Sequence, residues 1–320
     1  MNEGIFGHVL RVSEENGYDS PWQVLSHAGY AQDEMISATF SVGKFAAILG
    51  KDASTLTRHA YIGQSPEGHS EYRINGQCLG RGLNHSPFRL MRPEICPACL
   101  VENGQVDVCW DLSAFVACPS HGTRLVGRCS ACKSALSWFR PGLLTCSCGA
   151  NLAADLGEPA SSPLVSMMRV LQAKVHGEAV ATVVNDDGLP LDHLFGMQLD
   201  TMVRVVSILG RLAAIEGDQH YDRISAAACA FAEWPTGFYA YLRRMADAGI
   251  AASTESVGLR KRFAPLYQAL FKARVKLVGV EFLRDEFIKF GLEEWGEAAV
   301  DKKLLRGRRV SRWLSPRSCC

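Results

Sequence analysis

Apolar residues recur at helical spacing along most of the chain, apart from one central window. The stretch DSPWQVLSHAGY predicts a helix, because Ser20 can cap its N-terminus, Pro21 suits the first helical position and Gly29 can end it. The same kind of pattern continues on both sides of this stretch. We therefore expect the first ninety residues to be helical.

A second helical signal lies in FAAILGKDASTLTRHA. It predicts two short helical stretches on either side of Gly50 and Lys51, with Asp52 able to cap the second one. Two short helices joined by a tight turn are the outline of a helix-turn-helix, although a small helical bundle that only packs has the same pattern. In a helix-turn-helix the second helix contacts bases and phosphates. The candidate contact residues would then be Ser54, Thr55, Thr57 and Arg58.

Residues after position 163 again follow a helical period. In the stretch WPTGFYAYLRRMADAG, Thr236 can cap a helix and Gly249 can end it. The segment DLGEPASSP, residues 155–163, predicts a linker before this helical half. We expect the aromatic residues of this half to form the apolar faces of a core. They are Phe238, Tyr241, Phe263, Tyr267, Phe271, Phe282, Phe287 and Trp295.

Length and composition change this picture little. A chain of 320 residues allows two or three domains, and 48% hydrophobic with 21% charged residues is typical of a globular protein. The sequence does not begin with a basic segment followed by an apolar run, and no stretch approaches the ~18 apolar residues of a membrane helix. We therefore expect a cytoplasmic protein without membrane contact, in a compartment that keeps thiols reduced.

The formal net charge of +1 hides a basic C-terminus. Residues 299–320 hold 7 lysines and arginines against 1 acidic residue. Such a run is either a solvated end or a surface that binds phosphates and acidic partners. The candidate residues for nucleic-acid or partner binding are Lys302, Lys303, Arg306, Arg308, Arg309 and Arg312.

The central window holds 8 of the 12 cysteines. Most of them belong to four close-spaced pairs, which are Cys96 with Cys99, Cys118 with His121, Cys129 with Cys132, and Cys146 with Cys148. In chain order the pairs make one Cys₃His set and one Cys₄ set, which are the ligands of structural zinc. Disulfides are disfavoured in a reducing compartment. The sequence therefore predicts two structural zinc ions per chain and leaves Cys109 as a small buried residue.

An enzymatic zinc site is the competing interpretation. The HSE segment at residues 69–71, upstream of the first cysteine pair, superficially resembles the signature of zinc deaminases. However, Ile95 stands where that signature has a proline. Cys118 and His121 would also close the ligand shell and leave no position for a reactive water. The sequence contains no Gly-rich phosphate loop and no nucleophile elbow, so we expect a non-enzyme.

These motifs resemble the TniQ/TnsD family of transposition target-selection proteins. The resemblance is carried by CPxC at residues 96–99, WxL at 110–112, CPxHGxxL at 118–125, CxxC at 129–132 and CxCGxxL at 146–152. The segments HVLRVSEENGYDSPWQVLSHAG and WPTGFYAYLRRM are also similar to this family. The resemblance therefore extends over most of the chain.

The resemblance implies a bridging role without transposase activity. Family members link a target marker to the AAA+ ATPase regulator of a transposon, and the marker is target DNA, a replication or resolution feature, or an RNA-guided CRISPR effector complex. They carry helix-turn-helix elements beside the zinc region, and CRISPR-associated members form dimers, so we expect a homodimer. Family members commonly continue with helical sequence beyond the point where this chain ends in RWLSPRSCC, which favours a short adaptor.

Together these observations predict a mainly α fold with small zinc-bound β knuckles. The expected domains are an N-terminal helix-turn-helix-like domain at 1–90, a tandem zinc-ribbon or zinc-finger region at 91–153, a C-terminal helical domain at 154–298 and a basic tail at 299–320. The expected function is that of a non-enzymatic transposition adaptor. The alternative is a zinc-ribbon transcription regulator that reads DNA through residues 41–60.

Overall fold

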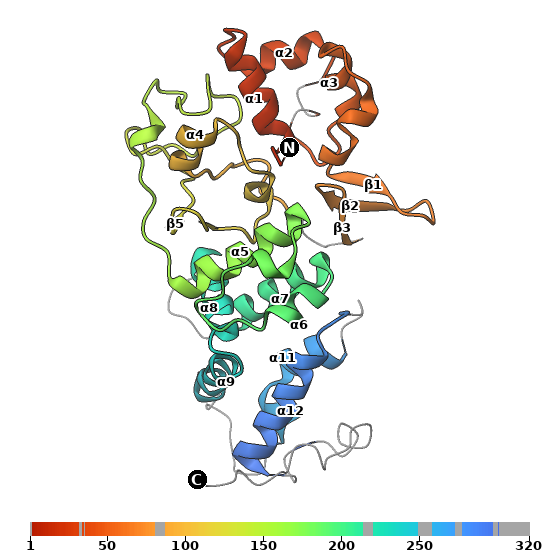
Figure 1. Cartoon of the computed structure of the whole chain (residues 1–320), viewed down its shortest axis with the longest axis vertical. Helices are drawn as coiled ribbons and strands as arrows, with labels where there is room; N and C mark the ends of the chain where they lie inside the picture. The colour runs from red at the N-terminus through yellow and green to blue at the C-terminus, as the bar shows by residue number, and fades with distance from the viewer. Residues whose placement is uncertain are drawn as a thin grey trace. The chain divides into compact units, whose positions relative to one another are not determined.

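A computed structural model describes residues 2–31, 34, 36–80, 87–213, 220–248, 258–272, 277–296 and 300. In this part of the chain the protein is mainly helical with two small antiparallel sheets, which confirms the expected fold class in this coarse form (Figure 1). The chain divides into two compact units, Met1–Asp186 and Asp187–Cys320.

The first unit begins with α1 (Ile5–Glu15), α2 (Pro21–His27) and α3 (Val42–Ile48). The predicted cap of α2 is confirmed, because the side chain of Ser20 accepts a hydrogen bond from the backbone N–H of Trp22 at 3.3 Å. Gly29 follows this helix with a φ of 70°, a left-handed conformation that glycine adopts without strain. The local sequence signals therefore determine where α2 begins and ends.

The stretch after α3 is helical but does not form an α-helix. It makes two 3₁₀ turns, η2 (Ala53–Thr55) and η3 (Thr57–His59). Asp52 caps the first turn by accepting the N–H of Ser54 at 2.8 Å, and Thr57 donates its hydroxyl to the carbonyl of Ala53 at 3.0 Å. Short polar side chains that bond to nearby backbone in this way compete with a longer helix. The helix-turn-helix therefore stays a prediction.

Residues 62–80 differ from the helical expectation, because they form a three-stranded antiparallel sheet. Its strands are β1 (Ile62–Gln64), β2 (Ser70–Ile74) and β3 (Gln77–Gly80), in the order β1-β2-β3. Asn75 and Gly76 join β2 to β3 with φ values of 48° and 81°. Asn-Gly is the preferred pair for such a two-residue hairpin turn. The Asn-Gly pair thus indicated a hairpin in the sequence, and the prediction of helix for this region was wrong.

The rest of the first unit has little regular structure apart from α5. Its elements are α4 (Pro97–Asn103), η4 (Val108–Asp111), β4 (Ala117–Cys118), β5 (Thr123–Arg124), η5 (Leu152–Ala154), α5 (Ser162–His176) and η6 (Val180–Thr182). The segment predicted as a linker is bound along its length. The N–H of Arg124 donates to Glu158 O at 2.7 Å, and the N–H of Ala160 donates to Gly122 O at 2.8 Å. These bonds hold the chain beside β5 as it leads into α5.

Phe6 of α1 lies in the aromatic core of the first unit. Its ring centroid lies 5.2 Å from that of Phe40, 5.8 Å from that of Tyr61 and 6.0 Å from that of Trp138. All four side chains are buried. Because Trp138 belongs to the cysteine-rich window, α1 and that window share one core.

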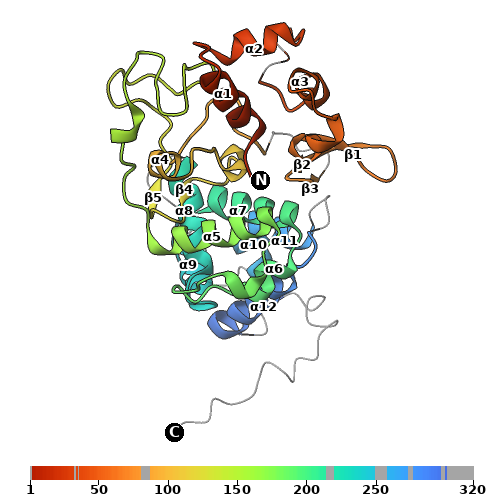
Figure 2. The ribbon, with the colours of Figure 1, turned by 45° about the horizontal axis from the view of Figure 1, so that its top comes forward.

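The second unit is helical. It contains α6 (Leu191–Gly196), α7 (Leu199–Leu212), α8 (His220–Phe231), α9 (Thr236–Ala248), α10 (Leu259–Arg262), α11 (Ala264–Phe271) and α12 (Glu281–Trp295). Helix α8 packs on both α7 and α9, and α11 packs on α7 and α12 (Figure 2). Six of the eight aromatic residues predicted for the core are buried, among them Phe238, Phe263 and Phe287, each at most 1% exposed. The other two, Phe271 and Trp295, are half-buried. In the described ranges, no helix is long and apolar enough to cross a membrane.

Candidate metal centres

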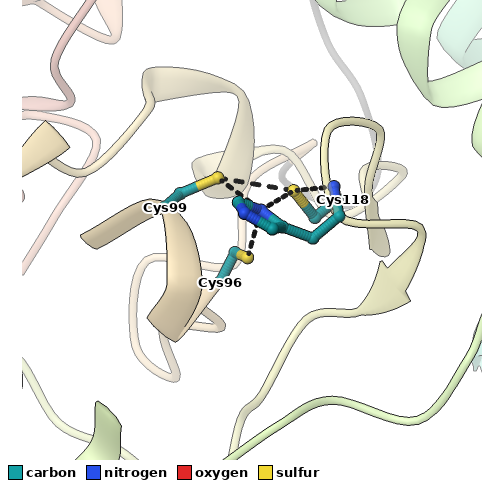
Figure 3. A group of neighbouring side chains, drawn as sticks. Cys96, Cys99 and Cys118 are labelled. Atoms are coloured by element: carbon teal, nitrogen blue, oxygen red, sulfur yellow. Dashed lines mark hydrogen bonds between the residues drawn. The ribbon is translucent and has the colours of Figure 1, made fainter. Parts of the chain in front are cut away.

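The first two ligand pairs of the sequence prediction converge on one point. Cys96, Cys99, Cys118 and His121 place their ligating atoms within 4.8 Å of one another. Figure 3 shows the sulfur atoms of Cys96, Cys99 and Cys118 turned toward the same centre. Four sulfur and nitrogen donors at this spacing could hold one metal ion.

Local structure explains how each pair forms its half of this site. Cys96 is the N-cap of α4 and Pro97 is the first helical residue, so Cys99 turns back toward Cys96 in the first helical turn. Cys118 ends β4, and Gly122 has a φ of 64° that allows the tight turn into β5. The backbone N–H of His121 donates to the sulfur of Cys118 at 3.4 Å, which fixes this second knuckle.

The separations between ligand atoms are close to those of a tetrahedral zinc site. The Nδ1 atom of His121 lies 3.4 Å from the sulfur of Cys96, 3.2 Å from that of Cys99 and 3.5 Å from that of Cys118. Zinc bond lengths predict about 3.6 Å for such S···N edges and about 3.8 Å for S···S edges. The sulfur atoms of Cys99 and Cys118 lie 3.4 Å apart, much further than a disulfide bond. No cysteine in the described ranges forms a disulfide.

Glu102 is a functional residue that the sequence analysis missed. Its Oε1 atom lies 3.0 Å from Nε2 of His121, so it orients the imidazole with Nδ1 toward the sulfurs. Metal-bound histidines commonly make this contact with their second nitrogen. The hydrogen bond to Glu102 raises the pKa of His121. A carboxylate one helical turn after Cys99 was the signal that could have identified it.

The three thiols of this site change one another's pKa. Hydrogen bonds from Cys118 and Cys99 lower the pKa of the Cys96 thiol. Hydrogen bonds with Cys118 and Cys96 raise the pKa of the Cys99 thiol in turn. Thiolates so close together repel one another unless a cation lies between them, and a divalent metal ion supplies that charge. The electrostatics of the site therefore favour a bound metal.

The other two pairs form a second cluster. Cys129, Cys132, Cys146 and Cys148 also place their sulfur atoms within 4.8 Å of one another. Cys129 and Cys148 are separated by 3.9 Å between sulfurs, and Cys132 and Cys146 by 3.8 Å. These distances match the S···S edge of about 3.8 Å expected for tetrahedral zinc. This cluster could also hold one metal ion.

Two tight turns shape the second cluster. In the first, Lys133 has a φ of 61° and its N–H donates to the carbonyl of Cys129 at 2.9 Å. In the second, Gly149 has a φ of 85° and its N–H donates to the carbonyl of Cys146 at 2.8 Å. Hydrogen bonding by Ser134 lowers the pKa of the exposed Cys132 thiol to about 6, which favours the thiolate that a metal requires.

A buried arginine supports the loop between the two halves of the second cluster. The guanidinium of Arg140 is completely buried and donates to the carbonyls of Ser137, Gly142 and Leu143 at 2.8–3.2 Å. Burial lowers the pKa of Arg140 to about 10. Arg140 thus supplies hydrogen bonds to a loop that has no regular secondary structure of its own.

The predicted nucleic-acid contacts fall in two different places. Ser54, Thr57 and Arg58 lie on the two 3₁₀ turns and are exposed, and Thr55 belongs to the first of these turns. The guanidinium of Arg58 donates to Oδ1 of Asn75 at 2.6 Å through Nη2. The six basic residues of the tail, Lys302, Lys303, Arg306, Arg308, Arg309 and Arg312, lie outside the described residues.

The deaminase-like HSE segment lies apart from both clusters. His69 precedes β2, and Glu71 on that strand accepts a hydrogen bond from Arg73 at 2.6 Å. Neither residue is among the groups of the described chain whose atoms converge as metal ligands. The first cluster instead takes its histidine from residue 121, as the spacing predicted.

Part of the chain matches a known family. The TniQ family model matches residues 1–125, which include α1 to β5 and all four residues of the first cluster. The second cluster and α5 lie beyond the matched region. A search of curated proteins finds no match. Residues 1–125 are therefore similar to the TniQ family, and this match supports a TniQ family protein.

Proposed function

We propose that this protein is a non-enzymatic adaptor in transposition. It links a target marker, which is target DNA or an RNA-guided CRISPR effector complex, to the AAA+ ATPase regulator of a transposon. The observation that carries this proposal is the TniQ match over residues 1–125. The match associates the chain with transposition, and the adaptor role follows from what this family does.

The ligand sets of the two clusters support a structural role for metal. Each cluster offers four sulfur or nitrogen donors, which fill the coordination shell of a tetrahedral ion. A catalytic zinc ion needs an open position for water or substrate, and a complete set of four protein ligands leaves none. We propose zinc as the ion in both sites, because thiolate and imidazole ligands favour it.

The exposed residues of η2 and η3 are the proposed contacts to nucleic acid in the first unit. Ser54, Thr57 and Arg58 are exposed, and a guanidinium is a common donor to phosphate oxygens. Within the chain, the Thr57 hydroxyl donates to Ala53 and Arg58 donates to Asn75, so binding to nucleic acid would exchange these bonds for bonds to phosphate. The basic tail at residues 299–320 adds a net charge of 7 − 1 = +6 as a second proposed contact. Phosphate contacts of this kind position a protein on nucleic acid without selecting a sequence.

We also propose that the adaptor is a homodimer. The expectation comes from the family, and two-fold dimers are the commonest oligomers of soluble proteins. Light scattering on the full chain at micromolar concentration tests this proposal, and a monomeric mass would contradict it.

A pull-down tests the adaptor function. The tagged full chain is mixed with the AAA+ ATPase and the transposase encoded beside it, with ATP, and with or without nucleic acid. We expect the wild-type protein to retain the ATPase. Any soluble fraction of Cys118→Ser should lose it because the first cluster cannot form, and the wild-type result decides the test where no soluble fraction remains. Cys78→Ser is the matched control, since Cys78 is exposed on β3 and belongs to neither cluster. If the wild-type protein retains no ATPase under any of these conditions, the adaptor function is wrong.

A further inference from the structure

A third group of metal-ligating side chains lies outside both clusters. Asp107 is the N-cap of η4, Cys109 lies within η4, and His176 is the last residue of α5. One ligand atom from each lies within 4.8 Å of the others. The group brings together residues that are 67 and 69 positions apart in the sequence.

Two of the distances in this group are close to those of a tetrahedral metal site, and the third lies within 4.8 Å. The Nε2 atom of His176 lies 3.6 Å from the sulfur of Cys109 and 3.1 Å from Oδ1 of Asp107. Zinc bond lengths predict about 3.6 Å for an S···N edge and about 3.4 Å for an N···O edge. The first cluster shows S···N separations of 3.2–3.5 Å, so the third group fits the same geometry as well as the first does.

The simpler alternative is that these residues form only hydrogen bonds that hold η4 against α5. Asp107 accepts the backbone N–H of Cys109 and the side-chain amide of Gln172, both at 2.8 Å. The first bond lies within η4, and the second already joins η4 to α5 without a metal. However, the sulfur of Cys109 and Oδ1 of Asp107 both approach the same imidazole nitrogen. One ring nitrogen carries at most one proton and directs it along one line, whereas a cation attracts all three atoms at once.

The second nitrogen of His176 gives an independent argument. Its Nδ1 atom lies 3.5 Å from Oε1 of Glu178. In the first cluster, Glu102 makes the corresponding contact with the free nitrogen of His121 at 3.0 Å. A carboxylate on the outer nitrogen is the usual companion of a metal-bound histidine. A longer contact of the same kind therefore occurs at His176.

The group also borders a cavity of about 330 Å³. Asp107, Gln172 and His176 form part of its wall, and Cys99 and Cys118 of the first cluster form another part. With three protein ligands, a tetrahedral ion keeps one position for a water or a small ligand. The cavity provides space for that fourth ligand. The two sites would thus be neighbours across one cavity.

We propose that Asp107, Cys109 and His176 form a third metal site for a zinc-like divalent cation. One sulfur, one nitrogen and one oxygen donor suit a cation of intermediate softness. The ion would bind α5 to η4 and so attach α5, which lies beyond the TniQ match, to the matched residues. This inference goes beyond the adaptor function and does not depend on it.

Metal content of the purified full chain tests the proposal. We expect three zinc ions per chain in the wild-type protein and two in Cys109→Ser, because serine keeps the size of the side chain but is a poor zinc ligand. Gln172→Ala should keep three, since Gln172 bonds to Asp107 without being a ligand. Cys229→Ser, which changes a half-buried cysteine of α8 outside every group, should also keep three.

Two results would overturn the proposal. One is a wild-type chain that holds two ions, both of which remain in Cys109→Ser. The other is a Cys109→Ser chain that still holds three. If Cys109→Ser does not fold, cadmium-113 NMR of the cadmium-loaded wild-type chain decides instead. Three resonances, one of them upfield of the two sulfur-rich sites, would support the third site, and two resonances would refute it. Neither the zinc content nor the NMR spectrum depends on transposition partners. A failed pull-down would therefore leave the proposal of a third metal site unaffected.

Discussion

Oε2 of Glu14 on α1 accepts a hydrogen bond at 2.9 Å from the backbone N–H of Leu143, 129 positions further along the chain. Leu143 lies in the loop between the two cysteine pairs of the second cluster. Glu14 lies within the TniQ match, and the second cluster lies outside it. This bond, together with the contact of Phe6 and Trp138, attaches the second cluster to the matched region.

The Glu14 contact should stabilise the first unit. Glu14 is exposed, so Glu14→Ala removes an ordinary hydrogen bond to the N–H of Leu143 and should lower the free energy of unfolding by about 0.5–1.5 kcal/mol. Glu15→Ala is the matched control, because Glu15 is equally exposed and its ion pair with Arg11 lies on the surface of the same helix. Urea denaturation of both variants checks this prediction. Equal stability of the two variants would contradict it.

Loss of one metal ligand should unfold its region. Structural zinc binds with an apparent free energy on the order of 10–16 kcal/mol, which is at least as large as the ~5–15 kcal/mol stability of a domain. We expect Cys118→Ser and Cys146→Ser to be insoluble or sensitive to protease, with at least one zinc ion fewer than the wild-type chain. Elemental analysis and limited proteolysis measure this, with Cys78→Ser as the control. A fully folded Cys118→Ser chain with its zinc content unchanged would contradict a zinc ion at the first cluster.

The Glu3 network should make stability depend on pH. Its carboxylate is completely buried and accepts hydrogen bonds from Arg11 at 2.9 Å, and it lies 2.7 Å from Nδ1 of His8. Burial raises the pKa of Glu3, but the bonds to Arg11 and His8 outweigh burial and hold that pKa below 4.5. His59 contacts the backbone carbonyl of Glu3, and Asp107 pairs with Glu3 in a β-bridge. Cys99, Cys118, Asp107 and His176 line the same cavity as Glu3.

A lowered folded-state pKa means that this stabilisation is present above pH 4.5 and is lost as the pH falls through the folded value. We therefore expect Glu3→Gln to lower the free energy of unfolding at pH 7 by about 1–3 kcal/mol. The difference in free energy of unfolding between the variant and the wild type should become smaller below pH 4.5. Acid also weakens the metal sites, so the difference between the two proteins is the quantity to measure. If the difference in free energy of unfolding between Glu3→Gln and wild type does not change with pH, the Glu3 carboxylate is not the source of the pH dependence.

Gly157 should not tolerate a side chain. A Cβ atom at this position would meet the backbone carbonyl oxygen of Arg124, which cannot move without shifting the chain. We expect Gly157→Ala to destabilise the first unit by about 1–3 kcal/mol. Gly43→Ala is the control, because the nearest atom to its Cβ would lie 3.8 Å away. Thermal melting compares the two, and an unchanged midpoint for Gly157→Ala would show that the segment beside β5 is not closely packed.

The basic tail should contribute salt-dependent binding. If residues 301–320 contact DNA or guide RNA, each neutralised phosphate adds about −0.9 (duplex) or −0.7 (single strand) to the slope of log K against log salt. Deleting them should weaken binding to all sequences alike and leave the zinc content unchanged. Fluorescence anisotropy at several salt concentrations measures the slope. An unchanged affinity and slope would mean that the tail is only a solvated end.

Features that depend on neighbours in the chain could be predicted from the order of the amino acids. Ser20 and Pro21 begin α2, and Thr236 begins α9, because caps and proline act within one helical turn. The membership of the two cysteine clusters was equally readable, since each knuckle contributes two ligands at a fixed short spacing. The hairpin at Asn75 and Gly76 was readable in principle, although the helical interpretation missed it.

Contacts between residues that are distant in the sequence could be identified from the folded chain alone. No local rule links Glu14 to Leu143, or His176 to Asp107 and Cys109, because these contacts follow from how α1 and α5 pack on the cysteine-rich window. The sequence identified Cys109 correctly as buried but could not supply its partners. Hydrogen-bond and ligand geometry depends on positions fixed to a fraction of an ångström, and close packing of the whole unit sets those positions.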